Sequence, residues 1–273
     1  MEENSIKKEY RQNLILGLES LSVFLISFYL LYIVSGLSVL YISWDFDIPA
    51  TLFLNHIHFQ VPDHSKLWTT DAIISILMAT PVSSFIAGIA AVFIFLIFPK
   101  KSRILLYFSL WIFLQAFNTT FGLLSENILS QTGLVRVARE MKLETAMLFL
   151  TVAMSIFFMI KSGQLAGKLY FSHLEGIGKM TASERYFKAC IFFLFPWLAG
   201  SILILFISGQ AIKSRETFLI TFMLFLLLPA VFTKIPVRQT PIISGRQFNW
   251  LLPLTSVAFI LTTYLILRNG FSF

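Results

Sequence analysis

Residues 72–98 read AIISILMATPVSSFIAGIAAVFIFLIF, a stretch of 27 residues without one charged side chain. About 18 consecutive apolar residues already indicate a membrane-spanning helix, because roughly 30 Å of hydrocarbon is crossed at 1.5 Å per residue. A strand of a transmembrane barrel would instead alternate apolar with polar residues. The sequence therefore predicts a transmembrane α-helix over residues 72–98.

The whole 273-residue chain has the same character, with 57% hydrophobic, 16% aromatic and only 13% charged residues. Its mean hydropathy is +0.80, whereas soluble domains carry about 25% charged residues. Six further apolar runs cover residues 14–41, 104–124, 145–160, 189–207, 217–233 and 249–267. Since no linker or repeat divides the chain, we expect residues 1–273 to form a single all-α domain, a bundle of about seven transmembrane helices.

The distribution of basic residues predicts the orientation of these helices. With a cytoplasmic N-terminus, fourteen of the 21 lysines and arginines fall in inner segments. The positive-inside rule then favours a multi-pass protein of the plasma (inner) membrane with its C-terminus outside. The same bias explains the net charge of +7 without nucleic acid. It predicts contacts between the inner segments and anionic lipid headgroups, and leaves a protein partner or a homo-oligomer open.

Motifs of known chemistry are missing from the sequence. It contains no HExxH, GxSxG, Walker or CxxC pattern, so most known intramembrane enzymes are excluded. Within the seven runs only Glu19 is ionisable, and we expect it to be a solvated carboxylate at the inner interface beside Arg11. The single cysteine, Cys190, is expected to be an inert buried thiol. We therefore expect no cofactor.

The first loop, between the first two runs, contains the densest polar sequence on the outer side. Its residues 55–61 alternate polar with apolar side chains, which predicts a short strand. Alternation places three polar side chains on one face of that strand: His56, His58 and Gln60. Four side chains of this loop could ligate a divalent metal such as zinc: His56, His58, Asp63 and His64. The alternative is an amphipathic strand or loop whose histidines face water.

The third run carries polar side chains in its outer half, Gln115, Asn118, Thr119 and Thr120. Spacings of four, three and four residues place Trp111, Gln115, Asn118 and Gly122 on one helix face. Buried amides on such a face join neighbouring helices, with about 0.6 kcal/mol per hydrogen bond. Alternatively, Gln115, Asn118 and Thr119 line a polar cavity. Gly122 is expected to end this helix.

Three local patterns add detail. Thr181 and Glu184 have the spacing of a capping box, which predicts a helix start at that point. Ser84 and Gly88 form a small-xxx-small pair that permits close approach of another helix. In the outer segment 125–144, residues 134–141 could form a short amphipathic helix.

Three classes of function are compatible with these observations. The leading interpretation is a non-enzymatic membrane protein, either an accessory or structural subunit or a facilitator of a neutral or lipid-like substrate. A second is a metal-dependent hydrolase or transferase whose site in the first loop faces the outside. A third is a secondary transporter with a polar path along the third run.

Overall fold

The computed structural model describes residues 2–97, 102–174, 180–208, 219–234 and 250–272. Within these residues the chain forms an all-α bundle, with six helices long and apolar enough to cross a membrane. The predicted run at 217–233 corresponds to a shorter apolar helix, Leu219–Val231. The prediction of a helical membrane bundle is therefore confirmed.

The elements follow one another along the chain as α1 (Glu2–Asp45), β1 (Ala50–Leu52), β2 (Ile57–Phe59), α2 (Thr70–Ile97), α3 (Arg103–Phe117), η1 (Asn118–Gly122), α4 (Leu123–Ser130), α5 (Leu134–Glu140), α6 (Thr145–His173), α7 (Ala182–Ala189), η3 (Cys190–Leu194), α8 (Phe195–Ser208), α10 (Leu224–Val231) and α11 (Leu251–Arg268). Both η segments are π-helices that join the α-helices on either side of them.

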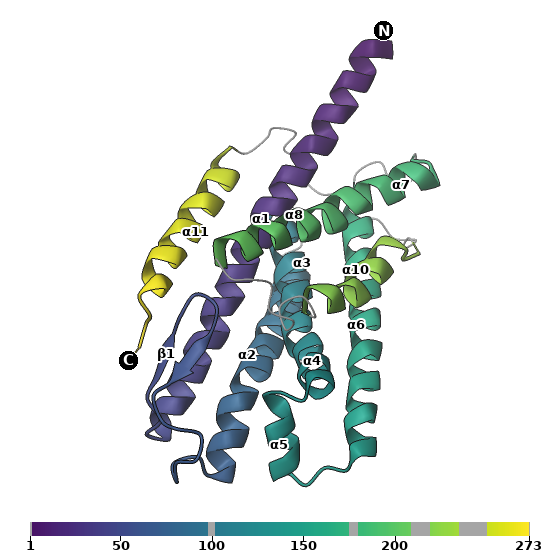
Figure 1. The fold of residues 1–273 in the computed structure, drawn as a ribbon. Helices are drawn as coiled ribbons and strands as arrows, with labels where there is room; N and C mark the ends of the chain where they lie inside the picture. Colours follow the sequence, from purple (N-terminus) through teal and green to yellow (C-terminus); the bar gives the residue numbers. More distant parts are fainter. Residues whose placement is uncertain (1, 98–101, 175–179, 209–218, 235–249, 273) are drawn as a thin grey trace.

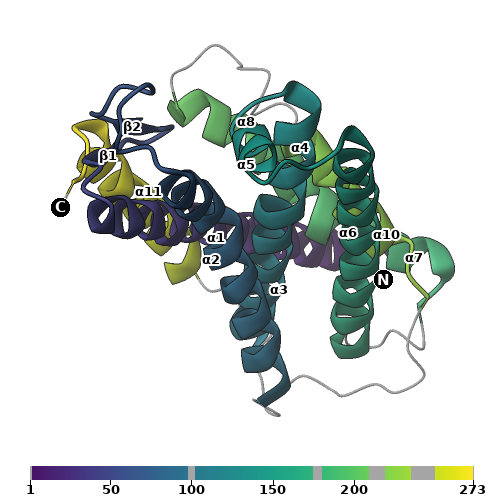
Figure 2. The same cartoon turned by 90° about the horizontal axis from the view of Figure 1, so that it is seen from below.

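The first part of α1 projects beyond the other helices at the end of the bundle that we call the N-terminal end (Figure 1). The strands, α5 and the start of α6 lie at the opposite end, here called the hairpin end (Figure 1). Helix α3 lies between α2 and α6 when the molecule is viewed along the bundle (Figure 2). Every side chain at positions 110–116 is buried. Helix α3 is therefore the central helix of the bundle.

The strand prediction in the first loop is confirmed, although β2 has only three residues. Strands β1 and β2 pair antiparallel with Leu52 opposite Ile57. The hairpin does not stand away from the bundle, because Leu52 packs on Gly36 of α1 and the hydroxyl of Tyr32 donates to the Phe53 carbonyl. On the edge of β1 that faces away from β2, Leu52 exchanges two backbone hydrogen bonds with Phe271. The hairpin thus joins the end of the chain to α1.

Small residues let two pairs of helices approach closely. A Cβ atom on Gly88 would lie 2.9 Å from the Phe117 ring, and Ser84 is fully buried, so this predicted contact surface is confirmed as one between α2 and α3. A Cβ on Gly163 would lie only 2.1 Å from the carbonyl oxygen of Leu226. The sequence Gly163-x-x-x-Gly167 is the signal for this second contact, between α6 and α10.

The third helix does not end at Gly122, contrary to the prediction. The π-helix η1 carries the chain through this position into α4, and the helix ends only at Ser130. A Cβ on Gly122 would lie 2.7 Å from Oδ1 of Asn118, so the glycine makes room for that amide. The predicted short helix is confirmed as α5, and Thr181 and Glu184 form the predicted capping box.

Candidate functional site

The candidate site is a row of buried polar side chains along α3, η1 and α4, which we call the polar column: Gln115, Asn118, Ser125, Glu126 and Asn127. None of them is more than 8% exposed. The π-helix η1 lies in the middle of the row, where the Leu123 N–H donates to the carbonyl of Asn118, five residues earlier. π-Helical segments inside α-helices occur frequently at functional sites.

Several hydrogen-bonding atoms of the column have no partner among the described residues. They are the amide nitrogen of Gln115, Oδ1 of Asn118 and the hydroxyl of Ser125. The other end of the Asn118 amide donates to the Leu219 carbonyl at 3.2 Å, so the column faces the chain just before α10. A buried polar atom without a partner costs about 1–3 kcal/mol, and such atoms are usually satisfied by bound water. The column therefore offers both donors and acceptors to a small polar molecule.

The hairpin end of the column contains a buried carboxylate. Glu126 is 1% exposed, and its two oxygens accept hydrogen bonds from the Asn127 amide at 2.8 Å and the Ser130 hydroxyl at 3.0 Å. Oδ1 of Asn127 accepts from the Leu134 N–H at 3.1 Å. This last bond attaches the start of α5 directly to the end of the column.

Helix α5 is also attached to the first loop. The Arg136 guanidinium lies 3.9 Å from the Asp63 carboxylate and 5.1 Å from the centre of the Trp68 ring. The hydroxyl of Thr70 donates to the Glu140 carboxylate at 3.0 Å. Helix α5 thus lies at the end of the column and contacts both the first loop and the start of α2.

The four residues of the predicted metal site, all of them described, share no hydrogen bond, ion pair or ring contact; each has a different neighbour or faces solvent. His56 stacks on Phe53 and its Nδ1 lies 2.6 Å from Oδ1 of Asn55, His58 is exposed on β2 opposite Thr51, and His64 is exposed. Asp63 faces Arg136 instead of an imidazole. Across the part of the chain that the structure describes, no group of three or more His, Cys, Asp or Glu side chains could hold a metal. Zinc binding therefore remains a prediction from sequence alone.

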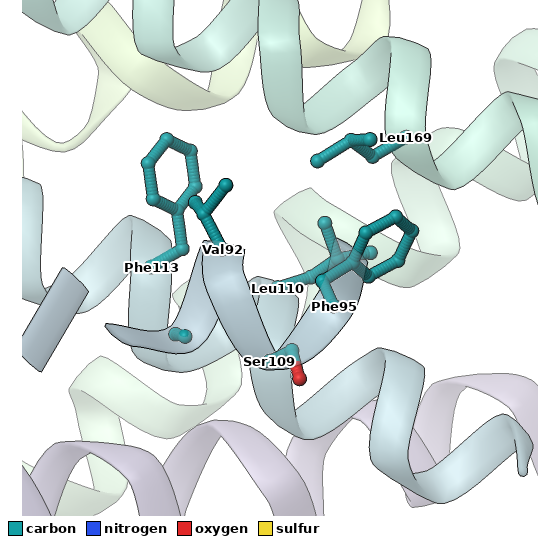
Figure 3. A pocket seen from close by; sticks show the side chains of 7 residues that line it. Val92, Phe95, Ser109, Leu110, Phe113 and Leu169 are labelled. Atoms are coloured by element: carbon teal, nitrogen blue, oxygen red, sulfur yellow. The ribbon is translucent and has the colours of Figure 1, made fainter. Parts of the chain in front are cut away.

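The polar cavity predicted at Gln115, Asn118 and Thr119 remains a prediction. Gln115 and Asn118 are buried, and Thr119 is partly exposed. A hollow between α2, α3 and α6 is lined by Ala91, Val92, Phe95, Ser109, Leu110, Phe113 and Leu169 (Figure 3), but it has no room for a water molecule. A second space, of about 160 Å³, lies between α4 and α6. Neither of these spaces touches the polar column.

A second buried polar cluster lies near the N-terminal end of the bundle. Glu19 is 1% exposed and forms an ion pair with Arg103 at 2.6 Å. The prediction of a solvated Glu19 beside Arg11 is therefore wrong, because α1 directs this carboxylate into the bundle, where the first residue of α3 meets it. Next to it, the Trp111 indole donates to Ser20, and Ser20 donates to the Phe192 carbonyl in η3.

No protein-family model matches the chain, and neither a curated protein nor a solved structure does. The class of protein is therefore defined by the fold and the site alone. It is an all-α membrane protein whose central helix carries a buried polar column, closed at one end by a short helix.

Proposed function

We propose that this protein is a non-enzymatic membrane protein that facilitates the passage of a small neutral molecule along the polar column. The observation that carries this proposal is the set of buried polar atoms without a partner among the described residues, which belong to Gln115, Asn118 and Ser125 along the continuous helix from α3 to α4. Buried polar groups usually form hydrogen bonds. The Asn118 amide uses only its nitrogen, toward the Leu219 carbonyl, which leaves its oxygen and the Gln115 nitrogen for a bound molecule.

The chemistry of the column favours a neutral molecule. Its unpartnered atoms are amide and hydroxyl groups, which recognise donors and acceptors without requiring charge. The carboxylate of Glu126 at the end of the column already accepts hydrogen bonds from Asn127 and Ser130. In this proposal the structure is the closed state, and the hairpin end lies on the outer side of the inner membrane, as the basic residues predict.

The alternative functions have weaker geometric support. A metal-dependent hydrolase would need His56, His58, Asp63 and His64 to converge, and the structure does not bring them together. In an accessory or structural subunit the buried amides would serve only to join neighbouring helices. Solute flux separates this alternative from a facilitator.

The test is solute flux through liposomes that contain the purified full-length chain. Water, urea and glycerol are suitable probes, with stopped-flow light scattering as the readout. We expect at least one solute to cross faster than in empty liposomes. Asn118→Leu should lower that flux roughly tenfold, because it removes a donor and an acceptor from the column.

Thr262→Val is the matched control, since this exposed threonine on α11 donates only to the Ala258 carbonyl of its own helix. Its flux should equal that of the unaltered protein. If no solute crosses faster than in empty liposomes, the facilitator proposal fails and the accessory subunit is favoured. Flux that Asn118→Leu leaves unchanged would also contradict the proposal.

A further inference from the structure

Polar side chains continue along the central helix beyond the polar column, toward the N-terminal end of the bundle. Spacings of four, four and three residues separate Tyr107, Trp111, Gln115 and Asn118, so all four lie on one face of the continuous helix. At 1.5 Å per residue, Tyr107 lies about 12 Å along the helix axis from Gln115. The column and Tyr107 are therefore parts of one polar face.

A second tyrosine, Tyr170 at the end of α6, lies close to Tyr107. Both rings contact the ring of Phe192 in η3, with 4.7 Å between ring centres for Tyr107 and 4.4 Å for Tyr170. Tyr107 is 5% exposed and Tyr170 is 1% exposed, and the two phenol groups interact electrostatically. Helices α3, α6 and η3 thus bring two buried phenol groups together, and we call them the tyrosine pair.

The hydroxyl of Tyr170 has no hydrogen-bond partner in the part of the chain that the structure describes. A buried polar group without a partner costs about 1–3 kcal/mol. Phenylalanine would fill nearly the same volume without this cost, and the chain has phenylalanine at 30 positions, including the next residue, Phe171. A bound molecule that hydrogen bonds to the Tyr170 hydroxyl would offset the cost.

The charges near the tyrosine pair favour an uncharged molecule. Tyr107 interacts electrostatically with both Arg103 and Glu19, which form an ion pair at 2.6 Å. Because the two charges of this pair compensate each other, they attract neither an anion nor a cation strongly. The hydroxyls themselves can donate and accept hydrogen bonds without requiring charge.

Trp111 lies between the tyrosine pair and Gln115 on the same helix face. Its indole N–H already donates to the Ser20 hydroxyl at 2.8 Å, and an indole has no other hydrogen-bonding group to offer. The tyrosine pair is therefore separated from the polar column by a residue whose donor is already used.

We propose that the hydroxyls of Tyr107 and Tyr170 form a second binding site for the solute that crosses the protein. This proposal rests on the facilitator function proposed above and extends the solute's path past Trp111 toward the N-terminal end. The ligand is a small uncharged molecule with hydrogen-bonding groups, of which urea and glycerol are examples. In the closed state Trp111 separates this site from the column.

The test is urea and glycerol flux through liposomes that contain the full-length Tyr170→Phe variant. We expect the flux to fall roughly fivefold, because the variant loses one hydrogen bond to the solute. The melting temperature in detergent should stay the same or rise, because only an unpartnered buried hydroxyl is removed. Tyr41→Phe is the matched control, since Tyr41 is 63% exposed on α1, and it should change neither flux nor melting.

The possible failures can be told apart. If the unaltered protein passes neither urea nor glycerol, the facilitator function fails for these solutes and the second site fails with it. Flux through the unaltered protein that Tyr170→Phe leaves unchanged would overturn the second site alone. A fall in flux together with a lower melting temperature would also overturn it, because the hydroxyl would then stabilise the fold instead of binding the solute.

Discussion

The indole N–H of Trp111 donates a hydrogen bond of 2.8 Å to the hydroxyl of Ser20 in the interior of the bundle. Ser20 donates in turn to the Phe192 carbonyl at 2.7 Å. Both Trp111 and Ser20 are fully buried. One hydroxyl therefore connects α1, α3 and the π-helix η3, and it satisfies two polar groups that have no access to water.

Replacing Ser20 with alanine should destabilise the protein by about 2–4 kcal/mol, since both the indole N–H and the carbonyl lose their partner. The measurement is thermal or denaturant unfolding in one detergent. Ser38→Ala is the matched control on the same helix, because the Ser38 hydroxyl is exposed and bonds only to the Val34 carbonyl. Its effect should stay within about 0.5 kcal/mol. Equal effects of the two variants would contradict this role of Ser20.

The ion pair between Glu19 and Arg103 should respond asymmetrically to mutation. Glu19 is 1% exposed, whereas the Arg103 side chain is 29% exposed. Arg103→Gln removes the cation that lies 2.6 Å from this buried carboxylate and should cost about 3 kcal/mol or more. Glu19→Gln should cost less, because the remaining guanidinium can reach water. Unfolding measurements on both variants decide the order, and a larger loss for Glu19→Gln would show that the carboxylate does not depend on Arg103.

The contact between α6 and α10 should be intolerant of a single methyl group. In Gly163→Ala the new Cβ would lie 2.1 Å from the Leu226 carbonyl oxygen, so the two backbones must separate. We expect a loss of about 1–3 kcal/mol or more, as for other overpacked sites. Leu165→Ala is the control, because Leu165 lies between the two glycines in sequence but is 41% exposed. Comparable unfolding of both variants would contradict the close contact.

The membrane-spanning helices could be predicted because lipid acts on each residue locally. A run such as 72–98 must be helical wherever its neighbours lie, since its backbone has no other partner in hydrocarbon. The face shared by Gln115 and Asn118 was predictable for a similar reason, because it follows from the helical repeat alone.

The rest of the site depends on contacts between distant residues or on local geometry that composition does not reveal. Glu126 and Asn127 lie beyond the polar residues that the sequence predicts on the third run, because Gly122 indicates a helix end there. In the structure this glycine lies inside a π-helix and accommodates the Asn118 side chain. The pairing of Glu19 with Arg103 joins residues 84 positions apart, and no local pattern indicates it.

Helix α5 is held by an exposed ion pair and by a buried hydrogen bond, and the two should contribute differently to its stability. Arg136→Gln removes an exposed pair with Asp63, so it should change stability by less than about 1 kcal/mol. Asn127→Ala removes the acceptor of the buried Leu134 N–H and a donor to Glu126, and should cost about 1–3 kcal/mol. Hydrogen exchange measured across residues 131–144 should therefore accelerate strongly in Asn127→Ala and little in Arg136→Gln. The reverse order would mean that the first loop, and not the polar column, holds α5 over the end of the column.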